Sequence, residues 1–323
     1  MTLSELSDLE TPWCVRVAVT LRIAELLSEG VRELADLAAA AECDRDALHA
    51  VLGHLASKGL FRETTPGCFD LNDLGRELMQ PETRIGLDLD GVGGRFAYAW
   101  GSLLQFVRTG APAYHEVFGV PFWEDLNANP EIGASFDALM GPTGHGTPDP
   151  DVLLAGDWET VHTVVDVGGG TGALLAEILR AHPDVHGILV DFPRTVARWA
   201  EIFDLAQVAD RVQTSGQSFF DPLPPGGDLY LLSKVINDWP DPEARAILRR
   251  CAEAAWPNGR VVVNGGVGRE AVRNRLSPEM VLVGGKHRGL AQFRALANSA
   301  GLEVTNAGEN KNGRYLVECR PSK

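Results

Sequence analysis

The second half of the chain alternates short apolar segments with helix-like segments, and this alternation limits the possible folds more than any other feature. From residue 161 the apolar segments are VHTVVDV, HGILVD, DLYLLSKVI and GRVVVNGG. Stretches of helical periodicity separate them, among them residues 194–207 and 241–255. Strands that are apolar throughout and joined by helices are typical of a parallel sheet covered on both faces. We therefore expect a doubly wound α/β domain over residues 151–323, with a last helix and two strands closing one edge of its sheet.

Residues 1–90 show a different pattern, that of helices followed by a hairpin. Apolar residues at helical spacing cover residues 9–29, and two shorter helical patterns follow, with Asp44 as the expected N-cap of the second and Gly59 near its end. The segment RETTPGCFDLND is typical of a hairpin that turns at Pro66 and Gly67. Helices and a hairpin in this order indicate an all-α/winged-helix domain.

A winged helix is often a DNA-binding module, but the charge of this chain argues against that function. The formal net charge is -15, which repels nucleic acids and anionic membranes at long range. No apolar run approaches the ~20 residues of a membrane span, and the N-terminus carries acids where a signal peptide carries bases. The five cysteines form no CxxC pair, so neither a disulfide framework nor a thiolate zinc site is expected. We expect a cytoplasmic protein that binds a small-molecule substrate, with no nucleic acid and no membrane as partner.

Residues 91–150 join these two regions and are helical and rich in aromatic side chains, ending in the Gly- and Pro-rich stretch GPTGHGTPDPD. Such aromatic density is common both in cores or interfaces and in the walls of clefts between domains. We expect this helical linker to line the substrate cleft and the domain boundary to lie near its end.

The sequence DVGGGTG, residues 166–172, follows an apolar strand and precedes the helical segment ALLAEILRA. Its glycines permit a tight turn and a close approach of the backbone to a ligand. The next strand ends in Asp191, about twenty residues further on, where a carboxylate can accept hydrogen bonds from both hydroxyls of a ribose. A nucleoside-containing cofactor is therefore expected, the alternative being a tightly packed turn without a ligand.

Two common nucleotide-binding patterns are missing from this loop. The stretch from Gly168 to Gly172 reads GGGTG and continues with Ala173, so the third glycine of GxGxxG is absent, and no P-loop lysine follows. S-adenosylmethionine contains a nucleoside but no phosphate. It is the cofactor that this pattern favours.

Further motifs follow in a fixed order along the chain, namely VDFP, FFDPLP, NDWPD and GGKHR. With these motifs, nearly the whole chain resembles the S-adenosylmethionine-dependent small-molecule O-methyltransferases of the plant caffeate type and their bacterial relatives in natural-product pathways. The resemblance implies a Rossmann-like methyltransferase domain preceded by a winged-helix dimerisation domain. It also implies an intertwined homodimer in which the N-terminal helices help to close the partner's substrate site.

The resemblance also assigns residues to the cofactor site. Gly168 and its neighbours would hold the methionine moiety, Asp191 the ribose, and Phe192 would lie beside the adenine. The family has an acidic residue for the adenine amino group where this chain has Ser218, and the family lysine at the end of the following strand is displaced by one position. The expected cofactor-binding residues are Asp166, Gly168, Gly169, Gly170, Asp191, Phe192, Ser218, Phe219, Ser233, Lys234 and Trp239.

The largest departure from the family lies in the stretch YLLSKVINDWP. In the O-methylating members this stretch contains His-Asp-Trp, and the histidine removes the proton from the substrate hydroxyl, whereas this chain has Asn237. A phenol has a pKa of about 10 and imidazole one of about 6.5, but an amide has no usable basicity. Asn237 can therefore hydrogen-bond to a substrate and cannot act as a general base. A second departure is His287 in GGKHR, where the family has a glutamate.

These departures leave three interpretations open. In the first, methyl transfer continues, with His287 or His145 as base or with a substrate that is nucleophilic without one, and with oxygen favoured over carbon or nitrogen as acceptor. In the second, the chain is a non-methylating relative, a hydroxylase or pericyclase-like enzyme that uses the charge of the cofactor or the shape of the pocket. In the third, it is a non-catalytic binding or regulatory protein that has kept the fold.

Candidate catalytic and substrate-binding residues follow from the linker and the strand ends. Asp238 is expected to cap the helix of PDPEARAILRRC, and Trp239 to pack beneath the cofactor or the sheet. A zinc or iron site built from His145, Asp238 and His287 is an alternative, but their spacing shows no ligand motif, so no metal is expected. The expected catalytic residues are Asn237, Asp238 and His287, and the expected substrate-binding residues are Trp100, Phe136, Met140, His145 and Met280.

Overall fold

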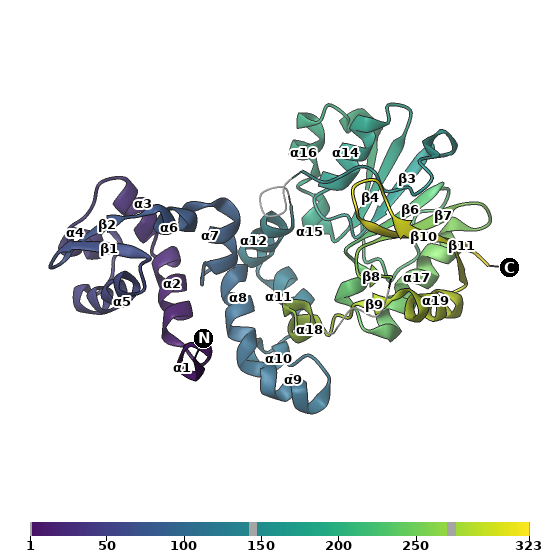
Figure 1. The fold of residues 1–323 in the computed structure, drawn as a ribbon. Helices are drawn as coiled ribbons and strands as arrows, with labels where there is room; N and C mark the ends of the chain where they lie inside the picture. Colours follow the sequence, from purple (N-terminus) through teal and green to yellow (C-terminus); the bar gives the residue numbers. More distant parts are fainter. Residues whose placement is uncertain (1, 142–146, 270–275, 323) are drawn as a thin grey trace. The chain divides into compact units, whose positions relative to one another are not determined.

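The computed structural model describes residues 2–141, 147–269 and 276–322 and divides into two compact units (Figure 1). The first comprises Met1–Tyr98 with Glu131–Leu139, and the second comprises Ala99–Pro130 with Met140–Lys323. The helices that follow the winged-helix region are thus shared between the two units. The division predicted at residues 90 and 150 stays a prediction.

The first unit consists of helices and one hairpin. Asp44 caps the fifth helix by accepting a hydrogen bond from the backbone N–H of Ala47 at 2.8 Å, as predicted. The two strands pair antiparallel on either side of Pro66 and Gly67. Its elements are α1 (Leu3–Leu6), α2 (Glu10–Thr20), α3 (Ile23–Ser28), α4 (Leu34–Ala40), α5 (Arg45–Ser57), β1 (Phe61–Thr65), β2 (Cys68–Leu71), α6 (Asp73–Arg76), η1 (Glu77–Met79), α7 (Pro81–Leu87), α8 (Val92–Ala99) and α12 (Pro130–Met140).

The helix predicted over residues 9–29 is in fact two helices, α2 and α3. Arg22 between them adopts a left-handed conformation, with φ of 57°. This residue redirects the chain so that Ile23 and Leu27 of α3 are buried in the core of the unit. Apolar spacing alone did not reveal the break, because both halves keep the same helical period.

The second unit contains the other described elements. No helix in the described parts of the chain combines the length and the apolarity that crossing a membrane requires. Its elements are η2 (Trp100–Ser102), α9 (Leu103–Thr109), α10 (Tyr114–Phe118), α11 (Phe122–Ala128), η3 (Trp158–Thr160), β3 (Thr163–Val167), α14 (Ala173–Ala181), β4 (His186–Asp191), α15 (Pro193–Val196), α16 (Trp199–Leu205), η4 (Ala209–Arg211), β5 (Val212–Gly216), β6 (Leu229–Ser233), η5 (Ile236–Asp238), α17 (Asp241–Ala255), β7 (Arg260–Asn264), β8 (Val267–Gly268), α18 (Pro278–Val283), β9 (Arg288–Gly289), α19 (Leu290–Ser299), β10 (Leu302–Glu309) and β11 (Tyr315–Pro321).

A seven-stranded sheet forms the centre of this unit, in the order β10-β11-β7-β6-β3-β4-β5. The strands from β7 to β5 are parallel, whereas β11 pairs antiparallel with both β7 and β10. One apolar cluster under α17 and α19 contains Ile247 and Phe293, and a second under α14 and α16 contains Leu175 and Phe203. The predicted doubly wound α/β sheet, closed at one edge by the two last strands, is confirmed.

The helix predicted over residues 194–207 is also divided, into α15 and α16. The two parts pack against different partners, since α15 lies against β4 and β5 whereas α16 lies against α14. Val196 at the end of α15 and Phe203 in α16 are both buried. A single straight helix could not pack against β4 and β5 and also against α14.

Candidate active site

Two loops follow neighbouring strands at the same edge of the sheet. The glycine loop comes after β3, and residues 234–239 come after β6, which pairs with β3. The chain passes from β3 to β4 and β5 on one side and then crosses to β6 on the other side of β3. Such a reversal opens a crevice at the carboxyl ends of the strands, where α/β proteins bind ligands.

The glycine loop is held to the end of β4 by its backbone. The N–H of Gly168 donates to the carbonyl of Val190 at 2.8 Å, and the N–H of Gly170 donates to Oδ2 of Asp191 at 2.8 Å. The other carboxylate oxygen of Asp191 accepts from the N–H of Phe192 at 2.7 Å. These bonds fix the orientation of the carboxylate that is predicted to bind a ribose.

Asp166, at the start of the glycine loop, is 1% exposed, and neither of its oxygens has a hydrogen-bond partner within the described chain. Burial, together with the charge of Asp191, raises the pKa of Asp166 to about 7. A β-carbon on Gly169 would lie 2.5 Å from Oδ2 of Asp166, so only glycine fits above this carboxylate. An acidic pair with one unpartnered member favours a cationic ligand, which would relieve both the repulsion and the missing hydrogen bonds.

Side chains from the ends of β5 and β6 meet at the same loop. A β-carbon on Gly168 would lie 2.8 Å from Val235 and 3.4 Å from the ring of Phe219. Trp239 stands edge-on to Phe219, at 5.8 Å between ring centroids, and stacks at 5.9 Å on Trp123 of α11. The predicted packing of the Trp239 indole is therefore against an aromatic wall beside the glycine loop.

The residues that replace the family's adenine contact are partly committed to local bonds. The Gln217 amide bridges Ser215 Oγ and the Pro222 carbonyl, at 2.7 and 2.9 Å. The hydroxyl of Ser218 accepts from the N–H of Phe220 at 3.2 Å, which leaves its own O–H as a donor. Contact between Ser218 and a cofactor stays a prediction.

Ser233 and Lys234 lie where β6 ends. Ser233 Oγ accepts from Nδ2 of Asn264 at 3.1 Å. Lys234 has φ of 57°, an uncommon value for a residue with a side chain. Burial, with a smaller effect from Arg314, lowers the pKa of the Lys234 ammonium. Their roles toward a cofactor stay predictions.

Asn237 lies in η5, at the same edge of the sheet as the glycine loop. Its Nδ2 donates to Oδ1 of Asp238 at 2.7 Å, and its Oδ1 is buried without a partner within the described residues. The prediction that Asp238 occupies the N-cap of α17 is wrong, because the helix begins at Asp241 and Pro240 is its N-cap. Asp238 instead orients the amide of Asn237. His287 is exposed, and its predicted catalytic role stays a prediction.

Two regions of the chain match known families. Residues 100–303 match the O-methyltransferase domain, and residues 6–81 match the O-methyltransferase dimerisation domain. The chain belongs to the O-methyltransferase family. This membership confirms the resemblance drawn from the motifs, the Rossmann-like methyltransferase fold with an N-terminal dimerisation domain, and the prediction of an S-adenosylmethionine-dependent enzyme.

Known proteins match the chain over nearly its whole length. The 2,7-dihydroxy-5-methyl-1-naphthoate 7-O-methyltransferase of Streptomyces carzinostaticus is 41% identical over 94% of this chain and 93% of that protein. The crystal structure of NcsB1, an O-methyltransferase from neocarzinostatin biosynthesis in complex with S-adenosylmethionine and 2-hydroxy-5-methyl naphthoic acid, has a TM-score of 0.90 at 38% identity and covers 99% of both chains. Aclacinomycin 10-hydroxylase RdmB of Streptomyces purpurascens is 37% identical over 94% of this chain and 84% of that protein.

The predicted substrate residues of this O-methyltransferase family member are only partly brought together. Met280 lies in α18, which packs against η5 and hence close to Asn237. Trp100 and Met140 belong to the same unit and are exposed, whereas Phe136 belongs to the other unit. His145 lies outside the described residues. All of these assignments stay predictions.

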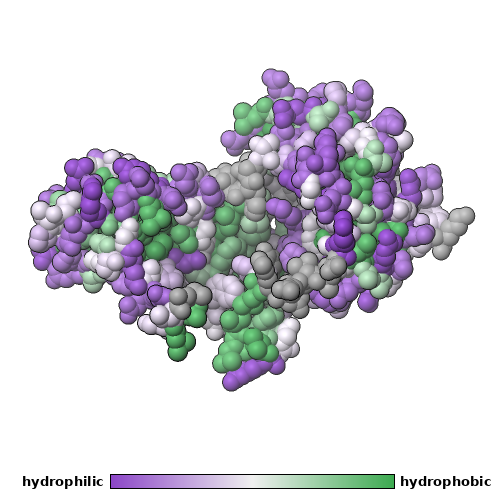
Figure 2. All heavy atoms as spheres, viewed as in Figure 1, coloured by the Kyte–Doolittle hydropathy of each residue, from purple (hydrophilic) through white to green (hydrophobic). Residues whose placement is uncertain are grey.

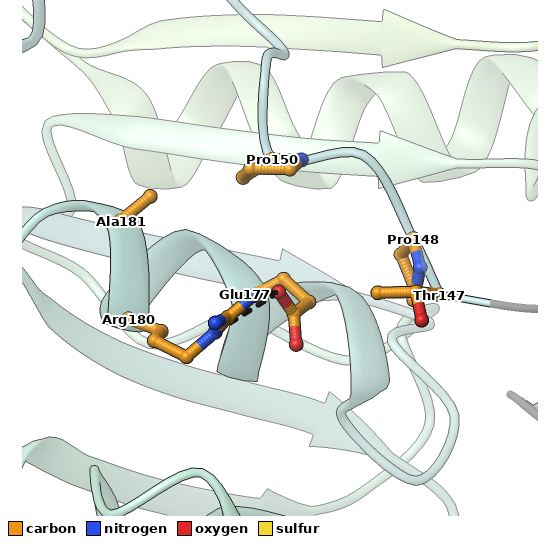
Figure 3. Close-up of a pocket in the computed structure, with 6 residues that line it drawn as sticks. All are labelled: Thr147, Pro148, Pro150, Glu177, Arg180 and Ala181. Atoms are coloured by element: carbon orange, nitrogen blue, oxygen red, sulfur yellow. Dashed lines mark hydrogen bonds and ion pairs between the residues drawn. The ribbon is translucent and has the colours of Figure 1, made fainter.

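A surface pocket of about 380 Å³ lies between residues 147–150 and the second half of α14 (Figure 3). None of the predicted cofactor-binding residues lines it. An ion pair between Glu177 and Arg180 crosses its floor (Figure 3). Its lining residues are Thr147, Pro148, Pro150, Glu177, Arg180 and Ala181. This open hollow is lined by both polar and apolar side chains and contains none of the residues at the strand ends.

No cluster of three or more His, Cys, Asp or Glu side chains suited to a metal ion occurs among the described residues of the O-methyltransferase. The combination of His145, Asp238 and His287 includes one histidine that lies outside them.

Sequence reasoning missed four contributors to the site. Trp123 stacks on Trp239, and Asp241 receives Nζ of Lys286 at 2.8 Å and Nε of Arg288 at 2.9 Å. Arg288 stands in the GGKHR motif, directly after the histidine that drew attention. No local signal marked Arg288, because it follows two other basic side chains in GGKHR and its partners Ile236 and Asp241 lie some fifty positions earlier.

Proposed function

We propose that this protein transfers a methyl group from S-adenosylmethionine to a hydroxyl group of a small aromatic natural-product intermediate. The observation that carries the proposal is the acidic pair at the glycine loop, Asp166 and Asp191, with Asp166 buried and unpartnered. S-adenosylmethionine is cationic at its amino group and its sulfonium, so it suits a site of this charge. The relatives named for naphthoate methylation support an aromatic hydroxy acid as the substrate class.

The chain's own residues fit this cofactor. Asp166 and the glycine loop would hold the methionine end, and Asp191, oriented by the N–H groups of Gly170 and Phe192, would receive the ribose hydroxyls. Bound S-adenosylmethionine supplies a methyl group already activated by its sulfonium. The protein therefore has to exclude water, align the acceptor oxygen and accommodate the proton that this oxygen loses.

We further propose that Asn237 aligns the acceptor and does not deprotonate it. One N–H of its Nδ2 donates to Asp238, and its buried Oδ1 is an acceptor that a substrate hydroxyl would satisfy. Alignment can lower a reaction barrier by roughly 7 to 11 kcal/mol. The proton then passes to solvent or to the exposed His287.

A second candidate function is a reaction without methyl transfer. The observation that favours it is Asn237 in place of the family's base, together with similarity to a relative named for hydroxylation. In this case the cofactor site is retained and no methyl group is consumed. Transfer to nitrogen or carbon and a non-catalytic binding role are the further alternatives.

The products formed with cofactor and substrate distinguish these functions. We expect the purified protein, given S-adenosylmethionine and 2,7-dihydroxy-5-methyl-1-naphthoate or related hydroxylated aromatic acids, to produce S-adenosylhomocysteine and a methyl ether in equal amounts, measured by mass spectrometry. Consumption of the aromatic compound without S-adenosylhomocysteine would establish the second function. Absence of any heat on calorimetric titration with S-adenosylhomocysteine would contradict the cofactor site itself.

We propose that the chain forms a homodimer through its N-terminal domain. Residues 6–81 match a dimerisation domain, and exposed leucines line α1 and the start of α2, while α9 also exposes Leu104 and Val107 (Figure 2). Such apolar side chains are costly to leave in water.

The cytoplasm is the compartment that we infer, because all five cysteines are unpaired.

Sedimentation tests the dimer. We expect wild type to sediment at twice the mass of one chain, and the double substitution Leu6→Lys with Leu9→Lys to weaken the dimer at least about 100-fold, since each buried leucine contributes about 1.5 to 3 kcal/mol. Leu205→Lys is the matched control, because Leu205 is an equally exposed leucine on α16. A dimer unchanged in the double variant would place the interface elsewhere.

A further inference from the structure

The segment that carries Asn237 is held mainly by a residue from far along the chain. Within the segment, the N–H of Asp238 donates to the carbonyl of Val235 at 3.1 Å. The side chain of Arg288 supplies most of the other bonds. Its Nη1 donates to the carbonyl of Ile236 at 2.8 Å and its Nη2 to the carbonyl of Trp239 at 2.7 Å.

These two carbonyls flank Asn237 and Asp238, so the guanidinium spans the η5 turn from one end to the other. The same group also donates from Nε to Oδ1 of Asp241 and from Nη1 to the carbonyl of Lys286, at 2.9 and 3.0 Å. The backbone N–H of Lys286 donates to the carbonyl of Asn237 at 2.8 Å. With the bond from Nζ of Lys286 to Asp241 at 2.8 Å, the segments 236–241 and 286–288 are tied together at five points.

Arg288 is 1% exposed, the most deeply buried cation in the described chain. Burial of a guanidinium is tolerated only where its donors are used and a negative charge lies close. Asp241 provides that charge, although its own carboxylate is partly exposed. If Arg288 only filled space, an apolar side chain of similar volume would stabilise the fold equally well. The buried charge therefore indicates a role in holding the η5 turn.

We propose that Arg288 is a positioning residue for the reaction: it fixes Asn237 and the Trp239 ring where the acceptor and the cofactor are bound, and so sets the turnover number. The inference rests on the proposed function. Its physical basis is that the guanidinium bonds to carbonyls at both ends of the η5 turn, so the position of the turn follows the planar fork of the guanidinium. A displacement of reacting groups by about 1 Å can lower a rate about 100-fold.

Lysine cannot replace arginine in this geometry. The guanidinium reaches four acceptors in different directions within one plane, whereas an ammonium is a single point charge on a flexible stem. Arg288→Lys is therefore expected to keep the ion pair with Asp241 and to lose most of the carbonyl contacts. Arg288→Gln is expected to lose both.

The experiment compares these variants with a second buried arginine. Arg260 begins β7 at the opposite edge of the sheet, is 8% exposed, and pairs with both oxygens of Asp157 at 2.9 and 2.7 Å. Arg260→Lys and Arg260→Gln thus carry the same chemical changes and a similar loss of stability without touching η5. Each variant is measured for thermal stability, for the Kd of S-adenosylhomocysteine by calorimetry, for kcat and KM, and for amide hydrogen exchange of residues 236–239.

We expect kcat to fall about 100-fold in Arg288→Gln and less in Arg288→Lys, with faster exchange of residues 236–239 and little change in cofactor Kd. The folded Arg260 variants are expected to keep the wild-type kcat. Added guanidinium is expected to restore part of the kcat of Arg288→Ala. It is not expected to restore the kcat of Asn237→Ala. These results together would establish the role, because loss of stability alone gives no rescue by guanidinium.

A folded Arg288→Gln with wild-type kcat and wild-type exchange would overturn the proposal. So would a fall in kcat that the Arg260 variants share. If wild type forms no S-adenosylhomocysteine with any hydroxylated aromatic acid, the proposed function fails instead. Amide hydrogen exchange of residues 236–239 and titration with substrate then still test whether Arg288 holds the turn. Exchange and substrate Kd in Arg288→Gln equal to those of wild type would overturn the positioning role as well.

Discussion

Asp166→Asn is expected to raise the melting temperature of the ligand-free protein at pH 8 while weakening its hold on S-adenosylmethionine. Burial, with the charge of Asp191, raises the pKa of Asp166 from 3.8 to about 7. The unfolded chain therefore ionises this carboxyl near its ordinary pKa, whereas the folded chain keeps the proton until about pH 7. The destabilisation of the folded protein is absent below pH 3.8, grows between pH 3.8 and about pH 7, and is constant at higher pH.

An asparagine escapes this penalty because it does not ionise. The gain at pH 8 is on the order of a few kcal/mol, reduced by the buried amide, which is itself left without partners. A rise in melting temperature of about 5 °C follows, and the rise should be smaller at pH 5. Scanning calorimetry of wild type and variant at both pH values measures it.

Cofactor binding should change in the opposite direction. The variant lacks the negative charge that a cationic ligand would meet, and a charge-assisted hydrogen bond contributes about 1.5 to 3 kcal/mol. The Kd of S-adenosylmethionine is therefore expected to rise about 10- to 100-fold. Stability gained and binding lost in one substitution are typical of a group kept for function.

Asp125→Asn is the matched control for this experiment. Asp125 is also buried, at 3% exposed, but it accepts hydrogen bonds from Tyr114 Oη at 2.6 Å and Asn129 Nδ2 at 2.7 Å. Loss of its charge should lower the melting temperature at both pH values, because two charge-assisted bonds are weakened. A lower melting temperature for Asp166→Asn at pH 8, or an unchanged cofactor Kd, would contradict the interpretation of this carboxylate.

Most of the fold could be predicted because its signals are local. The strands are apolar over their full length, and α17 was predicted with its observed bounds from one amphipathic stretch after a proline. The glycine loop and Asp191 were found because a strand, a glycine turn and an acidic strand end occur in sequence order. These features depend on neighbours along the chain, which a sequence displays directly.

The missed features depend on partners far apart in the sequence. Arg288 bonds to Ile236 and Asp241, some fifty positions earlier, and no periodicity connects them. Asp238 was expected to cap a helix because it precedes one, but Asn237 competes for its carboxylate and Pro240 takes the N-cap. The breaks at Arg22 and after Val196 arise because each half of a helix meets a different part of the core. Tertiary contacts decide such cases.

Gly170→Ala is expected to abolish most cofactor binding with only a modest loss of stability. Gly170 has φ of 63°, and no atom lies within 4 Å of the position that a β-carbon would take. The new methyl group would therefore enter open space beside the N–H that donates to Asp191, where the cofactor is proposed to lie. The left-handed backbone costs about 1 to 2 kcal/mol with any side chain, and crowding of a bound ligand costs about 1 to 3 kcal/mol more.

Gly226→Ala separates these two effects. Gly226 has φ of 89° and equally open surroundings, but it lies in the loop before β6, at the opposite edge of the sheet. Both variants should lose similar melting temperature, whereas only Gly170→Ala should raise the Kd of S-adenosylhomocysteine, by about 10- to 100-fold in calorimetric titration. Because the backbone strain is matched, a difference in Kd can only come from what occupies the space above the glycine loop. Equal Kd values in the two variants would mean that the ligand does not approach Gly170, and the cofactor site would have to be placed elsewhere along the strand ends.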